Sequence, residues 1–350
     1  MKTIRDIDTK NKTVLVRVDY NVPLKNGKVE NDLRIRASLP TINYLLEHGA
    51  KKIILISHLG RPEGKIVPEF SLSPIADDLR KLLPGQKIGF YPLPTADEKI
   101  ASPSDEKIIL LENLRFDPGE EANSLDFAKN LVSATAADIF VQDGFAVIHR
   151  AHASTEAITT LLPSYAGFLL EKEVKNLKKV LQDPVSPVVL IIGGAKVEDK
   201  QPLIDKFTKI ADQIIVGGKI AADGYAATNS KIYVAEDFDE DSTGAKLDIG
   251  PLSTGKIAGF ITDAKTVIWN GLLGYAEDPA YATASTITAE LIGEKTDATT
   301  IICGGDTTGF VENLMKDHPN LSYSLVSTGG GAALEFLLGK DLPGLKAISS

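Results

Sequence analysis

The segment VVLIIGG, at residues 188–194, has no polar side chain and ends in two glycines. Apolar runs of this kind are typical of parallel strands buried between layers of helices. Similar runs recur along the chain as VLVRV (14–18), KIILIS (52–57), KIILLE (107–112), DIFVQD (138–143), QIIVGG (213–218), TVIWNG (266–271), TIICGG (300–305) and LVSTGG (325–330). The stretches between them have helical patterns, including one in which Ser73 could serve as the N-cap. We therefore expect an α/β protein with parallel sheets flanked by helices.

The composition narrows the class of protein. A chain of 350 residues allows two or three domains, and 43% hydrophobic residues suffice to form buried cores. A net charge of -9 argues against a broad nucleic-acid or membrane surface, although a few arginines could still form a local anion site. The only cysteine, Cys303, excludes an internal disulfide. The opening MKTIRDIDTK resembles no secretory signal, and we expect a cytoplasmic protein.

The loops after the strands differ between the two halves of the chain. In the first half they carry arginine and histidine, in HLGR (58–61), ENLRF (112–116) and HRAHAS (149–154). In the second half they carry glycines, in GGAK (193–196), GGK (217–219), GGDT (304–307) and TGGGA (328–332). We expect two domains with different ligands, at residues 1–168 and 183–335, joined by a long helix at 169–182. The acidic run at 235–244 is expected to be a solvated loop.

The glycine junctions of the second half favour phosphate. A strand that ends in glycines and opens a helix places free N–H groups and a positive dipole end together. Lys196 and Lys200 are four residues apart, so inside the following helix they would share one side and could reach a phosphate chain. Two solvated lysines are an equally good interpretation. Asp306 could cap a helix or hold Mg²⁺ on nucleotide phosphates.

The first half carries an arginine-rich pattern at its strand ends. Asp19 and Asn21 follow the strand at 14–18, where they could cap a turn. Several loops contribute cationic or imidazole side chains: Arg34, Arg61, Arg115, Arg150, His58 and His149. Each alone is more often a surface residue. Together at one sheet edge they would form a clamp for carboxylate and phosphate.

The common alternatives lack support. No GxxxxGK[ST] and no GxGxxG after a strand is present, which disfavours a P-loop enzyme and a dinucleotide-dependent dehydrogenase. No serine has a nucleophile-elbow context. An anion clamp in one domain and a phosphate cradle in the other instead indicate phosphoryl transfer, which depends on positioning and charge stabilisation.

The same motifs, in the same order, resemble those of the phosphoglycerate kinase family over essentially the whole chain. The matching segments include RVDYNVPL (17–24), SHLGRPEGK (57–65), LLENLRFDPGEE (110–121), HRAHAST (149–155), IIGGAKVEDK (191–200), WNG (269–271), GGDT (304–307) and STGGGAALEFLLGKDLPGL (327–345). The resemblance implies two Rossmann-like domains joined by a long helix, with residues 336–350 packing back onto the first. It also implies phosphoryl transfer between 1,3-bisphosphoglycerate and ADP, giving 3-phosphoglycerate and ATP in glycolysis.

The resemblance also implies roles for individual residues. Catalysis would involve Arg34, Lys200, Gly330 and Gly331. Phosphoglycerate would be bound by Asp19, Asn21, Arg34, His58, Leu59, Gly60, Arg61, Arg115 and Arg150. The nucleotide would be bound by Gly194, Ala195, Lys196, Lys200, Gly217, Gly218, Asn270, Glu277, Gly304, Gly305, Asp306 and Thr307. Asp306 would ligate Mg²⁺ bound with ADP or ATP, and the enzyme would be a monomer without nucleic-acid or membrane partners.

The departures from the family pattern lie mainly on the nucleotide side. Lys219 replaces a glycine, and the segment at about 224–235 is shorter than usual. Further changes are Leu272, Ala276, Ala284 and Ser285, together with QDGFA (142–146) in place of NDAFG. These departures leave the selectivity for the base open. A catalytically weakened, phosphoglycerate-binding regulatory protein is the alternative function.

Overall fold

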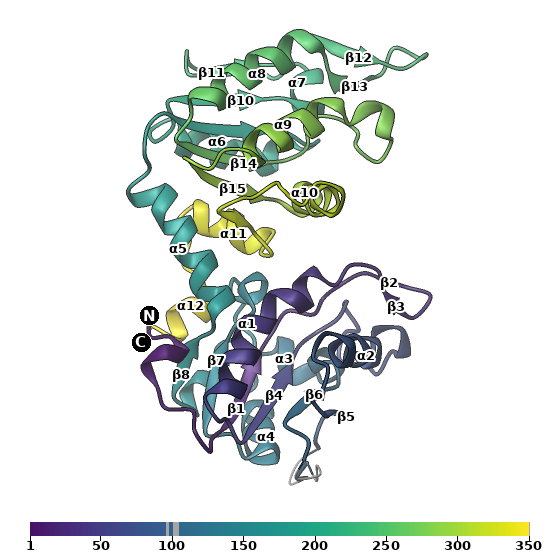
Figure 1. Cartoon of the computed structure of the whole chain (residues 1–350), viewed down its shortest axis with the longest axis vertical. Coiled ribbons are helices and arrows are strands. Elements are labelled where there is room, and N and C mark those ends of the chain that lie inside the picture. The colour runs from purple at the N-terminus through teal and green to yellow at the C-terminus, as the bar shows by residue number, and fades with distance from the viewer. Residues whose placement is uncertain (96–97, 101–104, 350) are drawn as a thin grey trace. The chain divides into compact units, whose positions relative to one another are not determined.

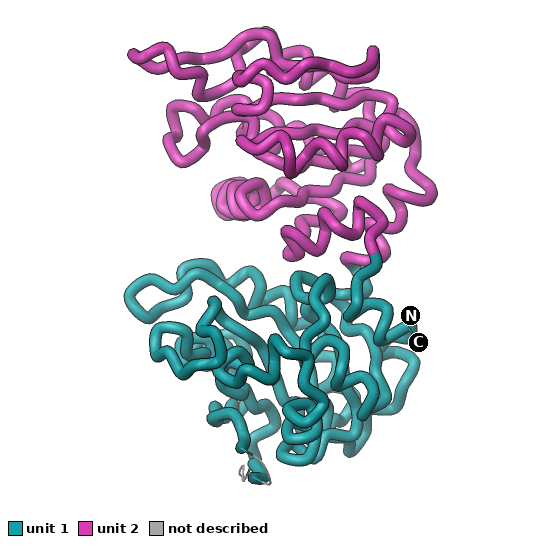
Figure 2. Tube along the Cα trace, turned by 180° about the vertical axis from the view of Figure 1, so that it is seen from behind, with its two compact units in different colours: residues 1–172, 341–350 teal, residues 173–340 magenta. Residues whose placement is uncertain are grey.

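The computed structural model describes residues 1–95, 98–100 and 105–349. The chain forms two compact units (Figure 2). Unit 1 comprises Met1–Lys172 and Asp341–Ser350, and unit 2 comprises Glu173–Lys340. The division falls inside the long helix α5, Phe168–Gln182. The C-terminal helix α12, Pro343–Ala347, belongs to unit 1, where Gly344 N donates to Ile148 O (2.9 Å).

Unit 1 is built on a six-stranded parallel sheet in the order β5-β6-β4-β1-β7-β8 (Figure 1). The central strands β1, β4, β6 and β7 are almost entirely buried because their side chains are apolar on both faces. The strands are β1 (Thr13–Arg17), β4 (Lys52–Ile56), β5 (Ile88–Tyr91), β6 (Ile108–Leu111), β7 (Ile139–Gln142) and β8 (Ser164–Ala166). A two-residue hairpin, β2 (Leu24–Lys25) and β3 (Lys28–Val29), lies outside this sheet.

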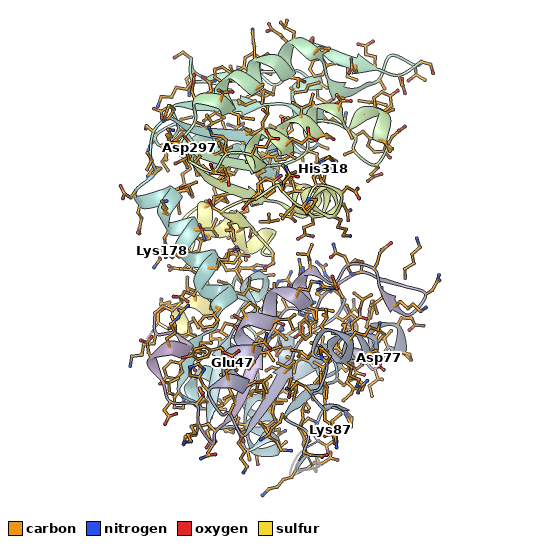
Figure 3. All side chains as sticks on the ribbon, viewed as in Figure 1. Glu47, Asp77, Lys87, Lys178, Asp297 and His318 are labelled. Atoms are coloured by element: carbon orange, nitrogen blue, oxygen red, sulfur yellow. The ribbon has the colours of Figure 1, made fainter. Side chains whose placement is uncertain are left out.

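The helices of unit 1 are α1 (Leu33–Glu47), α2 (Ser73–Leu82), α3 (Pro118–Glu121) and α4 (Leu125–Thr135). The predicted cap at Ser73 is wrong, because α2 begins at Ser73 and its N-cap is Leu72. Glu112 satisfies this helix start instead, since its Oε1 accepts from Leu72 N (2.8 Å). The apolar sides of α1 and α2 pack on the sheet, whereas charged side chains such as Asp77 and Lys87 lie at the surface (Figure 3).

Unit 2 contains a second six-stranded parallel sheet, in the order β11-β10-β9-β14-β15-β16. Its strands are β9 (Val188–Ile192), β10 (Gln213–Val216), β11 (Ile232–Val234), β14 (Thr266–Asn270), β15 (Thr299–Cys303) and β16 (Leu325–Val326). Its further helices are α6 (Val197–Phe207), α7 (Gly218–Ala222), α8 (Pro251–Asp263), α9 (Thr283–Gly293), α10 (Gly305–Asp317) and α11 (Gly331–Leu337). The two sheets confirm the predicted α/β class.

The acidic run of unit 2 differs from the sequence prediction. Residues 238–240 form strand β12 (Phe238–Glu240), which pairs antiparallel with β13 (Lys246–Ile249). Asp237, just before β12, accepts from Ser253 N (2.8 Å) and Leu252 N (2.8 Å) at the start of α8. One acidic residue therefore caps a helix, and part of the predicted solvated loop is a hairpin. None of the helices in the described part of the chain combines the length and apolar character needed to span a bilayer.

Candidate active site

The parallel sheet of unit 1 brings several predicted residues to one edge. Asp19 and Asn21 follow β1, the HLGR loop (58–61) follows β4, and Arg115 follows β6 in a 3-10 turn, Leu114–Phe116. These three strands are neighbours in the sheet and parallel, so their carboxyl ends meet. Ligands of open α/β sheets bind at such ends.

Direct contacts join these loops. Arg34 of α1 forms an ion pair with the buried carboxylate of Asp19. Gly60 N donates to Asn21 Oδ1 (2.9 Å), and Arg115 Nη1 donates to Gly60 O (2.7 Å). The structure therefore brings together Asp19, Asn21, Arg34 and Arg115 around one loop. Asn21 Oδ1 holds a neighbouring loop, and Asp19 Oδ1 accepts from Asn21 N (3.2 Å), so the turn-capping role also holds for Asp19.

The pKa shifts of two histidines agree with an excess of positive charge at this sheet edge. Burial lowers the pKa of His58 well below its usual range, and the guanidiniums of Arg17, Arg115 and Arg34 lower it further. Burial likewise lowers the pKa of His152 to about 4, with Arg115, Arg17 and Arg150 adding to the effect. Such Coulombic effects require short distances. Both imidazoles are therefore neutral near pH 7, and the positive charge of this edge resides on arginines.

Not every predicted side chain joins the cluster by a direct contact. Arg150 is half-buried and donates from Nε to His149 Nε2 (3.2 Å) in the loop after β7. Arg61 lies in the HLGR loop, where its side chain is exposed. Leu59 of the same loop is buried, and its carbonyl accepts from Asn113 Nδ2 (2.7 Å). Leu59 thus holds the loop through its backbone.

Three residues at this edge were missed by the sequence reasoning. Arg17 is buried at the end of β1 and donates from Nε to Ser154 Oγ (2.8 Å). Ser154 Oγ donates to Glu120 Oε1 (2.6 Å), and Ser154 N donates to Glu120 Oε2 (3.0 Å). The signal was the arginine inside the otherwise apolar run VLVRV, because a buried charge requires a partner.

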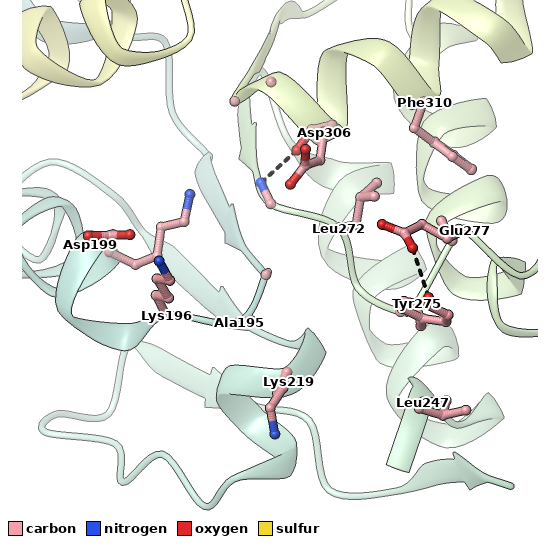
Figure 4. A pocket seen from close by; sticks show the side chains of 18 of the residues that line it. Ala195, Lys196, Asp199, Lys219, Leu247, Leu272, Tyr275, Glu277, Asp306 and Phe310 are labelled. Carbon is pink, nitrogen blue, oxygen red and sulfur yellow. Dashed lines mark hydrogen bonds between the residues drawn. The ribbon is translucent and has the colours of Figure 1, made fainter. Parts of the chain in front are cut away.

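The glycine-rich strand ends of unit 2 surround a cavity of about 690 Å³ (Figure 4). The predicted nucleotide residues that line it are Gly194, Ala195, Lys196, Lys200, Glu277, Gly304, Gly305, Asp306 and Thr307. Gly217, Gly218 and Asn270 do not line it but lie directly behind it. Gly217 N donates to Ile192 O (2.8 Å), and Asn270 Oδ1 accepts from Lys200 Nζ.

The two lysines reach the cavity from different backbone positions. The prediction that both lie inside one helix is wrong, because α6 begins at Val197 and Lys196 is its extended N-cap residue. Lys196 is exposed, whereas Lys200 is half-buried and bonded to Asn270. Burial lowers the pKa of Lys200, while Cys303, Asp199 and Asp306 act in the opposite direction. An incoming anion would satisfy both ammoniums.

Glycine is required where the loops around the cavity cross. A Cβ on Gly193 would lie 2.1 Å from Leu272 O, and one on Gly271 would lie 2.2 Å from Gly193 O. Gly271 also has a φ of +106°, in the region that side chains disfavour. The loops that follow β9 and β14 therefore approach more closely than any other residue allows, and their residues Gly194 and Gly271 line the cavity.

Asp306 lies in the first turn of α10 with an exposed side chain that lines the cavity. The alternative prediction of an N-cap at Asp306 is wrong, because Gly304 is the N-cap. Thr307 is buried, and its Oγ1 accepts from Gly271 N (2.8 Å). Within the described residues no group of three or more His, Cys, Asp or Glu side chains could hold a metal. A metal at Asp306 would therefore need oxygen ligands from a bound phosphate.

The outer wall of the cavity contains residues that the sequence reasoning did not identify. Tyr275 is half exposed, and its hydroxyl donates to Glu277 Oε2 (2.8 Å). Further lining residues are Lys246, Leu247, Phe310 and Asn313. They come from β13 and α10, and no motif marks them. Gly330 is the N-cap of α11 and Gly331 is its first residue, and a Cβ on either would meet nothing within 4 Å. Their proposed catalytic role stays a prediction.

The comparisons with known proteins agree with this geometry. A sequence model of the family described as phosphoglycerate kinase matches residues 4–239 and 221–340. The chain belongs to the phosphoglycerate kinase family. It is 41% identical to phosphoglycerate kinase from Moorella thermoacetica over 394 residues, covering 99% of this chain and 98% of that protein. It is 40% identical to the enzyme from Fervidobacterium nodosum over 398 residues, with the same coverage.

Solved phosphoglycerate kinases share the fold. The structure from Coxiella burnetii has a TM-score of 0.79 and 34% identity, covering 99% of this chain and 98% of that one. The structure from Pyrococcus horikoshii OT3 has a TM-score of 0.84 and 26% identity, covering 100% and 98%. The protein is thus a glycolytic kinase that transfers a phosphoryl group to and from a carboxyl group and uses a nucleotide substrate. The regulatory alternative has no support.

The comparisons also locate the shortened segment. The two matched parts of the family model overlap at residues 221–239, and the alignment with the Moorella protein spans 394 positions for a chain of 350. In the structure α7 ends at Ala222, and β11 begins at Ile232 after a short loop. The reduced segment therefore lies beside Lys219 and the cavity.

Proposed function

We propose that unit 1 binds 3-phosphoglycerate or 1,3-bisphosphoglycerate and that unit 2 binds ADP or ATP with Mg²⁺. In unit 1 the anion ligands are Asp19, Asn21, Arg34, His58, Leu59, Gly60, Arg61, Arg115 and Arg150. The ion pair of Asp19 with Arg34 supports this assignment, since it fixes a guanidinium at the sheet edge where other loops converge.

In unit 2 we propose that Lys196 and Lys200 bind nucleotide phosphates and that Glu277 binds the ribose. The cavity supports this arrangement because it places two ammoniums beside glycine loops with free N–H groups. Asn270 holds Lys200 in position until the phosphate replaces it as partner. Gly330 and Gly331 are proposed to donate N–H groups to the transferring phosphoryl. Gly217 and Gly218 are also assigned to nucleotide binding, and Gly218 supports the site from behind, since a Cβ on it would lie 2.7 Å from the carbonyl oxygen of the lining residue Leu272.

Asp306 is the proposed ligand for magnesium. Mg²⁺ commonly uses one or two carboxylates together with substrate phosphates, and the exposed carboxylate of Asp306, in the first turn of α10 at the cavity, fits that pattern. Bound there with the nucleotide, the ion would neutralise charge on the phosphate oxygens. The protein groups then complete the charge stabilisation through Lys196, Lys200 and the first turn of α10.

The chemistry proposed for the chain is direct phosphoryl transfer. Arg34 and Lys200 stabilise the charge of the transferring group, and the loops position donor and acceptor. No side chain is needed as a nucleophile, because the acceptor oxygen belongs to the substrate. We further propose a monomer located in the cytoplasm.

The lysine- and glycine-lined cavity with Asp306 is the observation that carries the proposal. A coupled assay with 1,3-bisphosphoglycerate and ADP should show ATP formation that depends on Mg²⁺. Lys200→Met should abolish most of this activity, whereas Lys209→Met on the same unit should not. Activity unchanged in Lys200→Met, or independent of Mg²⁺, would refute the assignment of the nucleotide site.

A further inference from the structure

A chain of buried polar side chains ends on one residue of the proposed anion site. Glu120 accepts from Ser154, and Ser154 Oγ accepts from Arg17 Nε (2.8 Å). The other end of the guanidinium, Arg17 Nη2, lies 3.1 Å from His58 Nδ1. Arg17, Glu120, Ser154 and His58 are all at least nine-tenths buried. The geometry of this chain determines which nitrogen of His58 can carry a proton.

Arginine only donates hydrogen bonds, because its guanidinium has five N–H groups and no acceptor. His58 Nδ1 must therefore accept from Arg17 Nη2, which places the ring proton on Nε2. The opposite tautomer would direct two N–H groups at each other and leave a buried charged donor without a partner. An imidazolium would create the same conflict, because it has an N–H at both positions.

The other groups that face His58 favour the neutral ring. Arg34 of α1, Arg115 after β6 and His152 after β7 each act electrostatically against a positive charge on it. The carboxylate of Asp19 also faces the ring, with its Oδ1 3.9 Å from His58 Nδ1, but it is already paired with Arg34. The ring is therefore surrounded mainly by cations.

The second ring nitrogen remains available for a ligand. Within the described residues His58 Nε2 has no hydrogen-bond partner. It keeps some contact with solvent, unlike the nitrogens without a partner that are fully buried. The proton that Arg17 forces onto Nε2 is therefore accessible at the sheet edge where the loops meet.

We infer that Arg17 is a positioning residue that holds His58 neutral, with its proton on Nε2, as a hydrogen-bond donor to the glycerate anion. The ligand in this inference rests on the proposed function, whereas the tautomer does not. His149 provides a contrast, because Arg150 Nε donates to its Nε2 (3.2 Å). The proton of His149 is therefore expected on Nδ1, so the two histidines have opposite tautomers.

Nitrogen-15 NMR of the full-length protein with labelled histidine tests the tautomers directly. Five histidines give a resolvable set, and His58→Gln and His149→Gln variants assign the two signals. Near pH 7 we expect His58 to show an unprotonated Nδ1 and a protonated Nε2, and His149 to show the reverse. The exposed His318 serves as the reference for an averaging ring. A protonated Nδ1 on His58 would overturn the inference whether or not the chain binds phosphoglycerate.

Substitution of Arg17 separates positioning from simple stability. Arg17→Met removes the donor, so the His58 signals should shift toward an averaged ring. The KM for 3-phosphoglycerate should rise roughly 10- to 100-fold, as expected for one hydrogen bond to a charged group. Arg17→Lys keeps the positive charge but loses the planar guanidinium with its several N–H donors. The His58 ring in this variant should favour the Nε2–H tautomer only in part. An unchanged His58 spectrum in a folded Arg17→Met protein would overturn the role of Arg17.

Two variants of His58 keep the test decisive if Arg17→Met does not fold. The amide nitrogen of glutamine can occupy the place of Nε2, whereas asparagine is too short to reach it. His58→Gln should therefore retain at least severalfold better affinity for 3-phosphoglycerate than His58→Asn. Equal losses in the two variants, with unchanged nucleotide KM, would contradict a donor at Nε2.

Discussion

The two proposed sites of the molecule differ in the groups that they offer to an anion. In unit 1 the proposed donors are side chains fixed by buried partners, as in Arg34 paired with Asp19 and His58 held by Arg17. In unit 2 the proposed donors are backbone N–H groups of glycine loops together with Lys196 and Lys200, and the exposed carboxylates of Asp199, Glu277 and Asp306 line the same cavity. The first arrangement is held by buried ion pairs and hydrogen bonds within the protein, and the second leaves more polar groups open to solvent.

This difference suggests how each site achieves selectivity. Fixed guanidinium forks match the geometry of one small anion, and an analogue that lacks a contact leaves a buried donor unsatisfied. Backbone donors and flexible ammoniums recognise a phosphate chain without reading what is attached to it. Unit 1 should therefore be the more selective site and the more sensitive to single substitutions. The following predictions test that contrast.

The largest effect is expected for Arg34 of unit 1. Arg34→Ala should lower kcat by roughly 10²–10³, the usual result of removing one preorganised donor to transition-state charge. Arg36→Ala is the matched control, because Arg36 lies on the same helix α1 but is exposed and pairs with Asp32 (2.7 Å). Steady-state kinetics on both variants should show a loss only for Arg34. A nearly normal kcat in Arg34→Ala would remove it from the catalytic group.

A second prediction concerns the free energy of unfolding of unit 1 and its dependence on pH. Asp143 is buried after β7, and its Oδ1 accepts from Leu169 N (2.9 Å) at the start of α5. Burial raises the pKa of Asp143 to about 7 from an ordinary 3.8. Between these values the folded chain holds a proton that the unfolded chain releases. The unfolding free energy should therefore fall as pH rises from about 4 to 7, by at most about 1.4 kcal/mol per pH unit.

Asp143→Asn should flatten this pH dependence, because the amide cannot ionise while its oxygen can still accept from Leu169. Urea denaturation at pH 5 and pH 7 measures the effect. Asp126→Asn is the control, since Asp126 is almost fully exposed on α4. A slope that persists unchanged in Asp143→Asn would assign it to another group.

The sequence predicted the central strands of the two sheets better than their edge strands. The long apolar runs became the central strands β1, β4, β6, β7, β9, β10, β14 and β15, because complete burial requires apolar side chains on both faces. No apolar run in the sequence indicated the edge strands β5, β8 and β11, which are three or four residues long and only partly buried. Short edge strands depend on pairing with a neighbour, which a local pattern does not contain.

The site was predictable where its residues lie in marked loops. Arginine loops and glycine pairs at strand ends indicated both sites, since parallel strands bring those ends together. Arg17 was missed because its role depends on Ser154 and Glu120, which are 137 and 103 positions away. Tyr275 and Phe310 line the cavity only because two distant segments meet there. Local sequence cannot supply such pairings.

The smallest expected effect concerns the nucleotide base. We expect the shortened segment after α7 to leave the base with less apolar wall, while Leu247, Leu272 and Phe310 line the cavity. One lost aliphatic contact costs roughly 1.5–3 kcal/mol, or about 10–200-fold in affinity. The KM for ADP should therefore be raised. The phosphate contacts of Lys196 and Lys200 do not depend on this wall, so binding should persist.

Lys219 should decide how the two purine bases compare. Its Nζ pairs with Asp223 (2.8 Å) but is exposed at the cavity, so it can move to a base oxygen at little cost. An ammonium only donates, and guanine offers a carbonyl where adenine has an amino group. GDP should therefore be used within about tenfold of ADP, and Lys219→Ala should weaken GDP by a few-fold more than ADP. Steady-state kinetics with ADP, GDP and IDP measure the ratio, with Lys209→Ala as the control. Strong rejection of GDP together with a low micromolar KM for ADP would show that the remaining residues rebuild an adenine-selective wall, and the contrast between the two sites would then be smaller than we propose.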